Sequence, residues 1–457
     1  MKLTFFIALL LAPLAVLQAA DAPRQKPNIL HINADDYRAD AVGAFGHPVV
    51  KTPNLDTLAE RGLTFTHCYT MGSMSGAVCQ PSRTMMLTGK SWQRIPKKGA
   101  GDPEASMAKV MSRADYETWH CGKSGNEYTP GLKAFDTNLS MEDHPQEMRR
   151  GSSERHADAA IKFLQERNAD KPFYLYLAPP VPHDPRVAAP EFHRMYDPAK
   201  VPLPPAFLPQ HPFDNGDMSV RDEMLAPFPR TPEDTKQQLA DYYACITGLD
   251  HHLGRIFGQL KKSGQWENTI IIFTADNGLS VGDHGLFGKQ NLFEFGGMHV
   301  PFVIAGPGIR HGTSDAFVYL MDLFPTFAEF GGAALPQNID GKSLVPVIKG
   351  TQQKVRDLLY TGYKDCQRSV RDLRWKLIRY PLVDKTQLFD LQNDPHELAN
   401  LAGKPEHAAK VAEMMEKLQA EMKRNDDTFP LTVADPKPAE WNPPATKPNA
   451  KKKAKTK

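Results

Sequence analysis

The chain has 457 residues, of which 41% are hydrophobic and 24% are charged, ordinary values for a globular protein with a sizeable core. Its formal net charge of +2 is unevenly distributed, because residues 431–457 carry a net +5 and the preceding residues a net −3. A slightly acidic body with a basic tail does not fit a nucleic-acid-binding protein, which would present a basic face, so we expect no nucleic-acid partner.

Residues 1–20 have the pattern of a secretory signal peptide. Lys2 precedes an apolar run over residues 5–17, and small residues follow that run. The run is too short for a membrane-spanning helix, so we expect no stable membrane span. The protein is therefore predicted to be exported, either to the periplasm or as a secreted protein.

Two apolar runs that end in acidic residues predict buried strands. Residues 28–33 are followed by Asp35 and Asp36, and residues 269–274 are followed by Asp276 and Asn277. The acidic side chains would therefore lie at the carboxyl ends of the two strands.

Other segments between these runs alternate between strand and helix patterns. Residues 117–121 and 173–177 are strand candidates, while a helical stripe begins near residue 152 and a longer one covers residues 239–260. This alternation predicts an α/β fold with a large, mostly parallel sheet sandwiched by helices. Ligands of such sheets lie beyond the carboxyl ends of the strands, where both acidic clusters are expected.

The remaining segments divide the chain into domains. Residues 190–232 are rich in proline and lack periodicity, which indicates a long excursion over the active face. A smaller antiparallel sheet and a final helix are predicted from strand patterns at residues 358–363, 369–380 and 387–391 and a helical pattern at residues 405–423. We expect a catalytic domain over residues 24–345, a C-terminal α+β subdomain over residues 346–430 and a disordered tail rich in Lys, Pro and Ala over residues 431–457.

The most specific stretch of the sequence covers residues 76–89. Cys79 is followed by Pro81, which fits a first helical position, and Arg83 lies one turn further on. Cys79 is therefore expected just before a helix N-terminus, where partial positive charge favours anions. Taken alone, a cysteine near a proline is better explained as a buried structural thiol. A functional interpretation of Cys79 therefore depends on the whole run from Cys79 through Gly89.

The acidic clusters have the chemistry of a metal site. Asp35, Asp36, Asp276 and Asn277 offer oxygen ligands of the kind that Ca²⁺ prefers, with Mg²⁺ as the second choice. Three crowded carboxylates would repel one another unless a cation neutralised them. The alternative for Asp276, Asn277 and Gly278 is a simple tight turn.

Cationic residues follow several of the predicted strands. Lys123, His183 and Lys289 are each unremarkable singly, as surface or loop residues. Because each follows a strand of one sheet, they can converge with Arg83 around a tetrahedral dianion.

The run of Cys79, Pro81, Ser82 and Arg83, ending in Leu87-Thr88-Gly89, resembles the signature of the type I sulfatases of the alkaline phosphatase superfamily. In that family the cysteine is oxidised after translation to formylglycine. The resemblance extends from Asn28 to about Leu401. It includes residues 34–36, 121–123, 182–185, 276–278, 282–289, 387–391 and 394–397.

The resemblance implies a sulfuric-ester hydrolase with an alkaline-phosphatase-like fold, acting on a sulfated small molecule or, as we expect, a sulfated carbohydrate. It also implies a formylglycine-generating maturation enzyme as a partner. The metal ion would be held by Asp35, Asp36, Asp276, Asn277 and the modified Cys79. The catalytic set would be Cys79 as nucleophile, Arg83 and Lys123 beside it, and His183 and Lys289 on the sulfate ester.

The resemblance further implies a covalent mechanism. A hydroxyl of the hydrated aldehyde at position 79 would attack sulfur in line, and an alcohol protonated by His183 or Lys289 would leave. The second hydroxyl would then expel sulfate.

Two departures from the family pattern keep alternatives open. Gly125 stands where the family has a histidine, and His299 precedes Val300-Pro301 where the family often has an arginine. His120 or His299 could replace the missing base. Otherwise the chain could be a catalytically impaired, sulfatase-like protein that binds sulfated glycans. A phosphatase or phosphodiesterase is a further alternative, although it would favour a Ser or Thr nucleophile and two metal ions.

Overall fold

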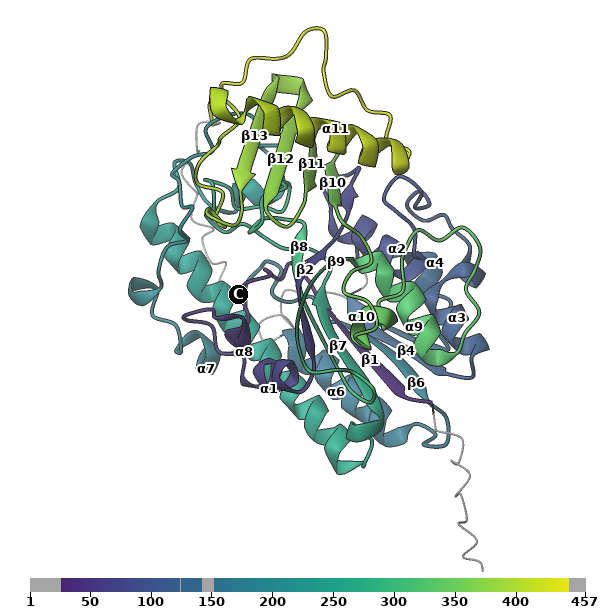
Figure 1. Cartoon of the computed structure of the whole chain (residues 1–457). Coiled ribbons are helices and arrows are strands. Elements are labelled where there is room, and N and C mark those ends of the chain that lie inside the picture. The colour runs from purple at the N-terminus through teal and green to yellow at the C-terminus, as the bar shows by residue number, and fades with distance from the viewer. Residues whose placement is uncertain (1–25, 124, 142–151, 444–457) are drawn as a thin grey trace, which may run out of the picture.

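The chain is organised around two β-sheets, shown in Figure 1. The structure, a computed structural model, describes residues 26–443 except residue 124 and residues 142–151. The predicted signal peptide and residues 444–457 of the predicted tail lie outside the described residues.

In the described part of the chain, eight strands form the larger sheet in the order β5-β4-β6-β1-β7-β8-β2-β9. The first five of these run parallel, whereas β8 is antiparallel to both of its neighbours. The bounds are β1 (Asn28–Ala34), β2 (Leu63–Tyr69), β4 (Glu117–Lys123), β5 (Thr137–Met141), β6 (Phe173–Ala178), β7 (Thr269–Ala275), β8 (His299–Ala305) and β9 (Gly312–Tyr319). The predicted α/β fold with a mostly parallel sheet is confirmed.

The two central strands that carry the acidic clusters lie side by side. Every residue of β1 and of β7 is buried, as expected for parallel strands covered on both faces. Their register pairs Ala34 with Ala275, the last residue of each strand. The segments that follow β1 and β7 and carry the acidic residues therefore begin next to each other at one edge of the sheet.

Helices cover both faces of the larger sheet (Figure 1). One group contains α1 (Pro53–Arg61), α6 (Ser152–Glu166), α7 (Pro190–His193) and α8 (Pro232–Lys262). The other group contains α2 (Cys79–Thr88), α3 (Met107–Arg113), α4 (Thr129–Leu132), α9 (Leu323–Gly331) and α10 (Val345–Ile348). The long helix α8 begins with the side chain of Thr231 accepting a hydrogen bond from the backbone N–H of Asp234, an ordinary N-cap. No helix within the described ranges has the length and hydrophobicity needed to cross a membrane.

The smaller sheet has the order β13-β12-β11-β10-β3 within the described residues. Its strands are β3 (Gly72–Ser73), β10 (Leu359–Tyr363), β11 (Gln367–Arg371), β12 (Trp375–Tyr380) and β13 (Lys385–Asp390), and α11 (Ala408–Arg424) packs on it. It is antiparallel except for the pairing of β3 with β10. The short strand β3 thus joins the subdomain to the segment just before Cys79.

The stretch 369–380 differs from the strand predicted there, because it contains a turn between β11 and β12. The carboxylate of Asp372 accepts hydrogen bonds from the backbone N–H groups of Arg374 (3.0 Å) and Trp375 (2.7 Å). Such a local side-chain bond favours a turn over a continuous strand.

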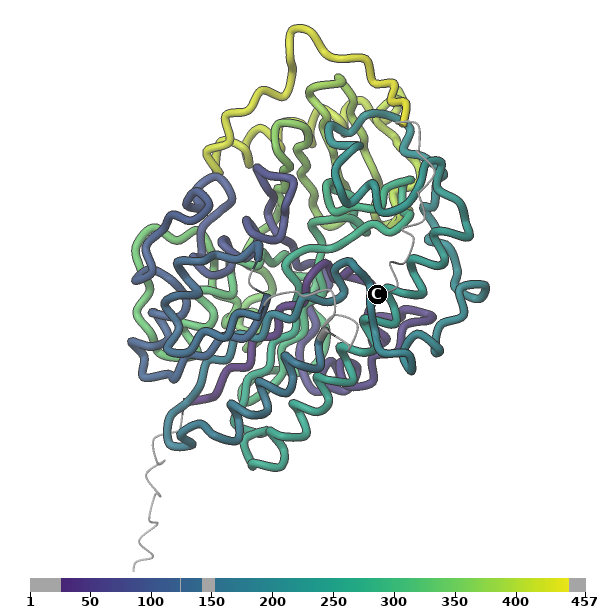
Figure 2. Tube along the Cα trace, turned by 180° about the vertical axis from the view of Figure 1, so that it is seen from behind, coloured from purple at the N-terminus to yellow at the C-terminus, as the bar shows by residue number. Residues whose placement is uncertain are grey.

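The first part of the predicted disordered tail is packed in this structure. The backbone N–H of Asp214 donates to the carbonyl of Ala439 (2.8 Å), and the rings of Phe228 and Trp441 are in contact with centroids 4.8 Å apart. Leu431 and Trp441 also pack against the apolar cluster of the smaller sheet. Figure 2 shows the excursion over residues 190–232 beside this C-terminal part of the chain. The predicted disorder therefore does not apply to residues 431–441, because their apolar side chains pack against the apolar cluster of the smaller sheet.

A buried ionic cluster joins the two sheets. Glu294, which precedes β8, forms ion pairs with Arg371 (2.6 Å) of β11 and with Lys376 (2.9 Å) of β12. Lys376 also contacts Glu397 (2.9 Å), whose carboxylate accepts the backbone N–H of Glu294 (2.6 Å). Burial opposes ionisation of both acids, but the cations hold the pKa of Glu294 well below its usual range, whereas the pKa of Glu397 rises to about 7. The free energy of unfolding should therefore depend on pH through the protonation of Glu397.

We predict that Glu397→Gln removes part of this pH dependence. The folded pKa of about 7 lies above the ordinary value of 4.5, so the folded state retains a proton that the unfolded state releases. The stability contributed by this group is fully present below pH 4.5 and is lost as the pH rises through about 7. Urea unfolding should show that the wild-type free energy of unfolding, relative to that of the variant, falls between these pH values. A pH-independent difference would contradict the assignment.

Candidate active site

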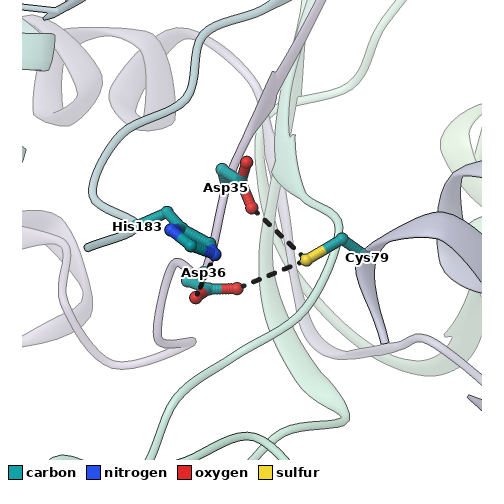
Figure 3. Close-up of side chains that lie close together, drawn as sticks. All are labelled: Asp35, Asp36, Cys79 and His183. Atoms are coloured by element: carbon teal, nitrogen blue, oxygen red, sulfur yellow. Dashed lines mark hydrogen bonds and ion pairs between the residues drawn. The ribbon is translucent and has the colours of Figure 1, made fainter. Parts of the chain in front are cut away.

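The site lies beyond the carboxyl ends of the central strands, as predicted. Figure 3 shows Asp35 and Asp36 facing Cys79, with His183 beside them. The sulfur of Cys79 lies 3.5 Å from a carboxylate oxygen of Asp35 and 3.7 Å from one of Asp36. Asp35, Asp36 and Cys79 are essentially inaccessible to solvent.

The backbone at Asp36 turns sharply to bring these groups together. Asp36 has a φ of 61°, in the left-handed region that aspartate adopts more readily than most residues. Its N–H donates to Asp276 Oδ1 (3.1 Å), and its carbonyl accepts the hydroxyl of Tyr242 (2.7 Å) from α8. The turn is therefore held by the neighbouring strand end and by the long helix.

The helix after the cysteine begins earlier than predicted. α2 starts at Cys79 itself, and Pro81 is its third residue, because the N–H of Ser82 already donates to the carbonyl of Val78 (3.1 Å). Proline is tolerated there, since N–H groups of the first turn have no partner within the helix. Burial and the carboxylate of Asp276 raise the pKa of the Cys79 thiol well above its usual value. The unmodified thiol therefore stays protonated at neutral pH.

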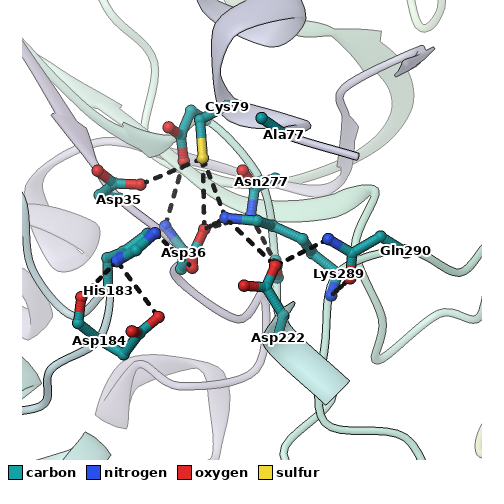
Figure 4. Close-up of polar contacts among 12 residues, drawn as sticks. Asp35, Asp36, Ala77, Cys79, His183, Asp184, Asp222, Asn277, Lys289 and Gln290 are labelled. Atoms are coloured by element: carbon teal, nitrogen blue, oxygen red, sulfur yellow. Dashed lines mark hydrogen bonds and ion pairs between the residues drawn. The ribbon is translucent and has the colours of Figure 1, made fainter. Parts of the chain in front are cut away.

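Three cations face the three carboxylates. Arg83 Nε contacts Asp276 (2.8 Å), and a second guanidinium nitrogen lies 3.4 Å from Asp35. Lys123 forms a close ion pair with Asp35. Figure 4 shows Lys289 reaching the site, with its ammonium 2.6 Å from Asp36 and 3.0 Å from the sulfur of Cys79.

These ion pairs decide which carboxyl groups are charged. Burial opposes ionisation of Asp35 and Asp36, but Lys123 and Lys289 respectively outweigh it and hold both pKa values below their usual range. For Asp276, burial and the charge of Asp35 prevail, and its pKa is raised. Asp276 is thus the carboxyl group of the site whose charged form the surrounding cations stabilise least.

Asn277 supports the interpretation of the cluster as a metal site. Its amide nitrogen donates to Asp36 (2.7 Å) and to the carbonyl of Gly278 (2.8 Å). Its Oδ1 atom is buried and has no hydrogen-bond partner among the described residues. Asp35, Asp36, Cys79 and His183 also offer ligand atoms that all lie within 4.8 Å of one another. A free amide oxygen beside buried carboxylates fits a hard divalent cation.

Gly278 lets the segment after β7 pass close to the backbone of residues 296–299. A Cβ atom on Gly278 would lie 2.3 Å from the carbonyl oxygen of Gly296 and 2.6 Å from that of His299. The tight turn that the sequence suggested as an alternative is not what holds this segment, because the backbone N–H of Gly278 donates to the carbonyl of Gly297 (2.8 Å).

His183 lies on the more open side of the site, with 19% of its side chain exposed. Its Nδ1–H donates to the backbone carbonyl of Asp184 (2.6 Å), since a carbonyl can only accept. Its other nitrogen, Nε2, lies 3.7 Å from a carboxylate oxygen of Asp36. This arrangement points Nε2 into the site and makes it the nitrogen that can gain or lose a proton.

All nine residues predicted from the sequence converge here. They are Asp35, Asp36, Cys79, Arg83, Lys123, His183, Asp276, Asn277 and Lys289.

The suggested replacements for the missing histidine are bonded elsewhere. His120 Nδ1 bonds to Asn138 (2.7 Å), and burial lowers its pKa to about 3. His299 bonds to the carbonyl of Thr66 (2.9 Å) and stacks on Tyr69.

Sequence reasoning missed three residues beside the site. Glu127 is buried and pairs with Arg83, and burial raises its pKa to about 7 despite that partner. Gln290 accepts the backbone N–H of Lys289 (3.0 Å) and donates to Asp222 (2.8 Å). Asp222 lies in the aperiodic excursion, and Glu127 follows a strand after a short turn, so no periodicity marked either of them.

Comparison with known proteins places the chain in a family. The family model for sulfatases matches residues 27–333, and the model described as N-sulphoglucosamine sulphohydrolase, C-terminal, matches residues 282–424. The chain is 27% identical to N-acetylglucosamine-6-O-sulfatase of Bacteroides thetaiotaomicron, with 92% of each chain covered. It is 29% identical to arylsulfatase K of Rattus norvegicus, with 83% of this chain and 75% of the relative covered.

Solved structures show the same fold. A protein in complex with its substrate D-glucosamine-2-N,6-O-disulfate superposes with a TM-score of 0.72 at 24% identity, covering 89% of this chain and 99% of that one. A phosphonate monoester hydrolase of Agrobacterium radiobacter gives 0.73 at 24% identity, with coverages of 88% and 96%. At such identities the likeness establishes the fold alone. Because the sulfatase model spans residues 27–333, which include the entire cluster around Cys79, the chain belongs to the sulfatase family, the sulfuric-ester hydrolases of the alkaline phosphatase superfamily.

Proposed function

We propose that this sulfatase is formylglycine-dependent, uses a divalent metal ion and removes sulfate from a sulfated carbohydrate outside the cytoplasm. The observation that carries the proposal is the position of Cys79. Its side chain lies between the carboxylates of Asp35 and Asp36 and the ammonium of Lys289, in a buried site at the sheet edge. The sulfur of Cys79 therefore lies where a nucleophile would be close both to carboxylates that could hold a metal ion and to a cation that could bind an anionic substrate.

The metal would be held by Asp35, Asp36, Asp276, Asn277 and the modified Cys79. An all-oxygen donor set with buried carboxylates favours Ca²⁺, with Mg²⁺ as the second choice. When bound, the ion would act as a Lewis acid and stabilise the charged forms of these buried carboxylates.

Formylglycine at position 79 would supply an oxygen nucleophile through its hydrate. The raised pKa of the unmodified thiol is consistent with this need, because a protonated thiol is a poor nucleophile. The short run around Cys79 would be the recognition sequence of a maturation enzyme, which we propose as a partner.

Lys289, Arg83 and Lys123 would provide fixed positive charge around the sulfate group. All three are buried, so their attraction for an anion is weakly screened by solvent. Their positions are set before substrate binds, because each already pairs with a carboxylate of the site.

His183 would protonate the leaving oxygen. Because Nδ1–H donates its hydrogen bond to the backbone carbonyl of Asp184, only Nε2 can transfer a proton to the leaving oxygen. As the sulfur–oxygen bond breaks, its electron pair stays with the leaving oxygen, which takes the proton from Nε2 and departs as an alcohol. His183 is left neutral.

Relatives support a carbohydrate substrate. One is named N-acetylglucosamine-6-O-sulfatase, and another, from Formosa agariphila, is named ulvan-active sulfatase and is 28% identical over 88% of this chain. Export to the periplasm or the medium is supported by the pattern of residues 1–20.

The convergence of the predicted catalytic residues favours hydrolysis over binding alone. His183, Lys123 and Lys289 all converge on the site although position 125 is a glycine. A phosphatase is disfavoured because the nucleophile position holds a cysteine and the cluster fits one metal ion rather than two.

The modification is testable directly. In protein produced with a formylglycine-generating enzyme, mass spectrometry of the peptide that contains Cys79 should show the aldehyde in place of the thiol. Cys79→Ala should abolish turnover with unchanged thermal unfolding, whereas Cys245→Ala in α8 should remain active. Fully active protein with an unmodified Cys79 thiol would refute the mechanism.

The metal site is tested by elemental analysis. Purified protein should contain about one divalent ion per chain, and extensive chelation should remove both the ion and the activity. Asp276→Ala should retain less metal, while Asp250→Asn, which changes a buried aspartate bonded to Asn54, should not. Activity that persists in protein shown to lack any divalent ion would overturn the assignment.

The roles of His183 and Lys289 are tested by alanine substitution. Either change should lower kcat roughly a hundredfold or more, because acid catalysis or charge stabilisation is lost. The exposed His311 offers a control substitution that should leave kcat unaltered. Unchanged rates in both site variants would place sulfate binding elsewhere.

A further inference from the structure

Three consecutive charged residues of the excursion contact the site from one side. Arg221, Asp222 and Glu223 begin the 3₁₀ helix η4 (Arg221–Leu225), in the segment between β6 and α8. Arg221 is exposed over 59% of its side chain, whereas Asp222 and Glu223 are buried. Glu223 and Asp222 contact the loop that carries Lys289, whereas Arg221 contacts the loop that carries His183.

Glu223 anchors the segment. Its carboxylate accepts the backbone N–H groups of Phe287 (2.9 Å) and Gly288 (2.8 Å) and pairs with Arg230 (2.7 Å). These bonds attach η4 to the loop that carries Lys289. The start of η4 is therefore fixed relative to the site.

Asp222 bonds to the neighbour of Lys289. It accepts a hydrogen bond from Gln290 Nε2 (2.8 Å), and Gln290 also donates to the carbonyl of Gly76 (2.9 Å), three residues before Cys79. The carboxylate lies 4.0 Å from the ammonium of Lys289. Figure 4 shows Asp222 and Gln290 on the side of Lys289 away from Asp35.

Arg221 contacts the loop that carries His183. Its guanidinium donates two hydrogen bonds to the two carboxylate oxygens of Asp184, each 2.7 Å long. Asp184 in turn accepts His183 Nδ1–H on its backbone carbonyl (2.6 Å), and its carboxylate lies 3.4 Å from the same nitrogen. The bidentate pair has a fixed geometry, so it restricts how Asp184, and with it the imidazole of His183, can rotate.

We propose that Arg221 is a positioning residue for proton transfer, holding Asp184 so that His183 presents Nε2 to the leaving oxygen. The inference rests on the acid role proposed for His183. Glu223 and Asp222 keep Arg221 in place, while Arg221 itself does not contact Cys79 or the carboxylates that would hold the metal in any contact found among the described residues. Because exposed ion pairs contribute little to folding stability, loss of Arg221 should affect the acid more than the fold.

The leaving group provides a readout that a purely structural role would not change. The phenol released from 4-nitrophenyl sulfate is acidic and departs with little help from a proton, whereas the phenol released from phenyl sulfate needs protonation. In matured, metal-loaded enzyme, Arg221→Ala should lower kcat about tenfold on phenyl sulfate and less than about threefold on 4-nitrophenyl sulfate. Arg221→Lys, which cannot form the bidentate pair, should fall in between. Arg194→Ala, an exposed arginine of the same excursion, is the matched control and should behave as wild type on both substrates.

The route of the effect is tested in the absence of His183. If Arg221 acts through that histidine, the double variant Arg221→Ala with His183→Ala should be no slower on phenyl sulfate than His183→Ala alone. Equal losses on both aryl sulfates, or a further loss in the double variant, would overturn the proposal.

A measurement without turnover separates this inference from the proposed function. Nitrogen-15 spectra of the neutral histidine rings, recorded at a pH above their titration and with the His183→Ala spectrum identifying the signal, should show the single ring proton of wild-type His183 on Nδ1. The Arg221→Ala protein should show a mixture of tautomers at an unchanged melting temperature. An unaltered tautomer in that variant would refute positioning by Arg221, even if the protein hydrolysed no aryl sulfate and the proposed function had failed.

Discussion

The structure around Cys79 depends on the balance of buried charge at the carboxyl edge of the sheet. Asp35, Asp36 and Asp276 are shielded from water together with the cations that face them. An unpaired charge in such a place would cost several kcal/mol, roughly 3–5 when one partner of a buried pair is removed. Acids and cations from distant parts of the sequence must therefore arrive together, and the fold must hold them in one arrangement. That constraint makes the site rigid before any ligand enters it.

The sheet register achieves this arrangement. Because β1 and β7 end in register at Ala34 and Ala275, their acidic segments emerge side by side, and the neighbouring strands β4 and β6 lead to Lys123 and His183. Cys79 comes from the start of α2, and the short strand β3 that precedes it is paired with the smaller sheet. The strand ends, α2 and the loop after β7 thus supply the residues proposed to act on the sulfate group, while the excursion before α8 supplies Arg221 and Asp222 beside them.

Much of this could be predicted from residue patterns. Fully buried strands have continuous apolar runs, and residues after parallel strands share an edge, so the α/β fold and the shared edge of the acidic clusters followed from these patterns. The full set of nine site residues, which includes Cys79 and Arg83 of α2, followed from the resemblance to the sulfatases. The turn at Asp372 inside a predicted strand was missed, because one aspartate bonding to its own backbone outweighs local strand preference. The packed segment up to Trp441 was missed too, since its composition resembles a disordered tail and only the surface beneath it supplies the stabilising contacts.

The sequence by itself determined the sheet, its active edge and the residue types gathered there, because these follow from periodicity and from the short run around Cys79. Only the tertiary structure decided which cation pairs with which carboxylate, which nitrogen of His183 faces the site, and that Glu127, Asp222 and Arg221 stand beside it. Those contacts join segments that are far apart along the chain. Several of the side chains that make them lie in loops or in the aperiodic segment over residues 190–232. No local pattern encodes them, because their geometry exists only once the strands and helices that carry them have packed.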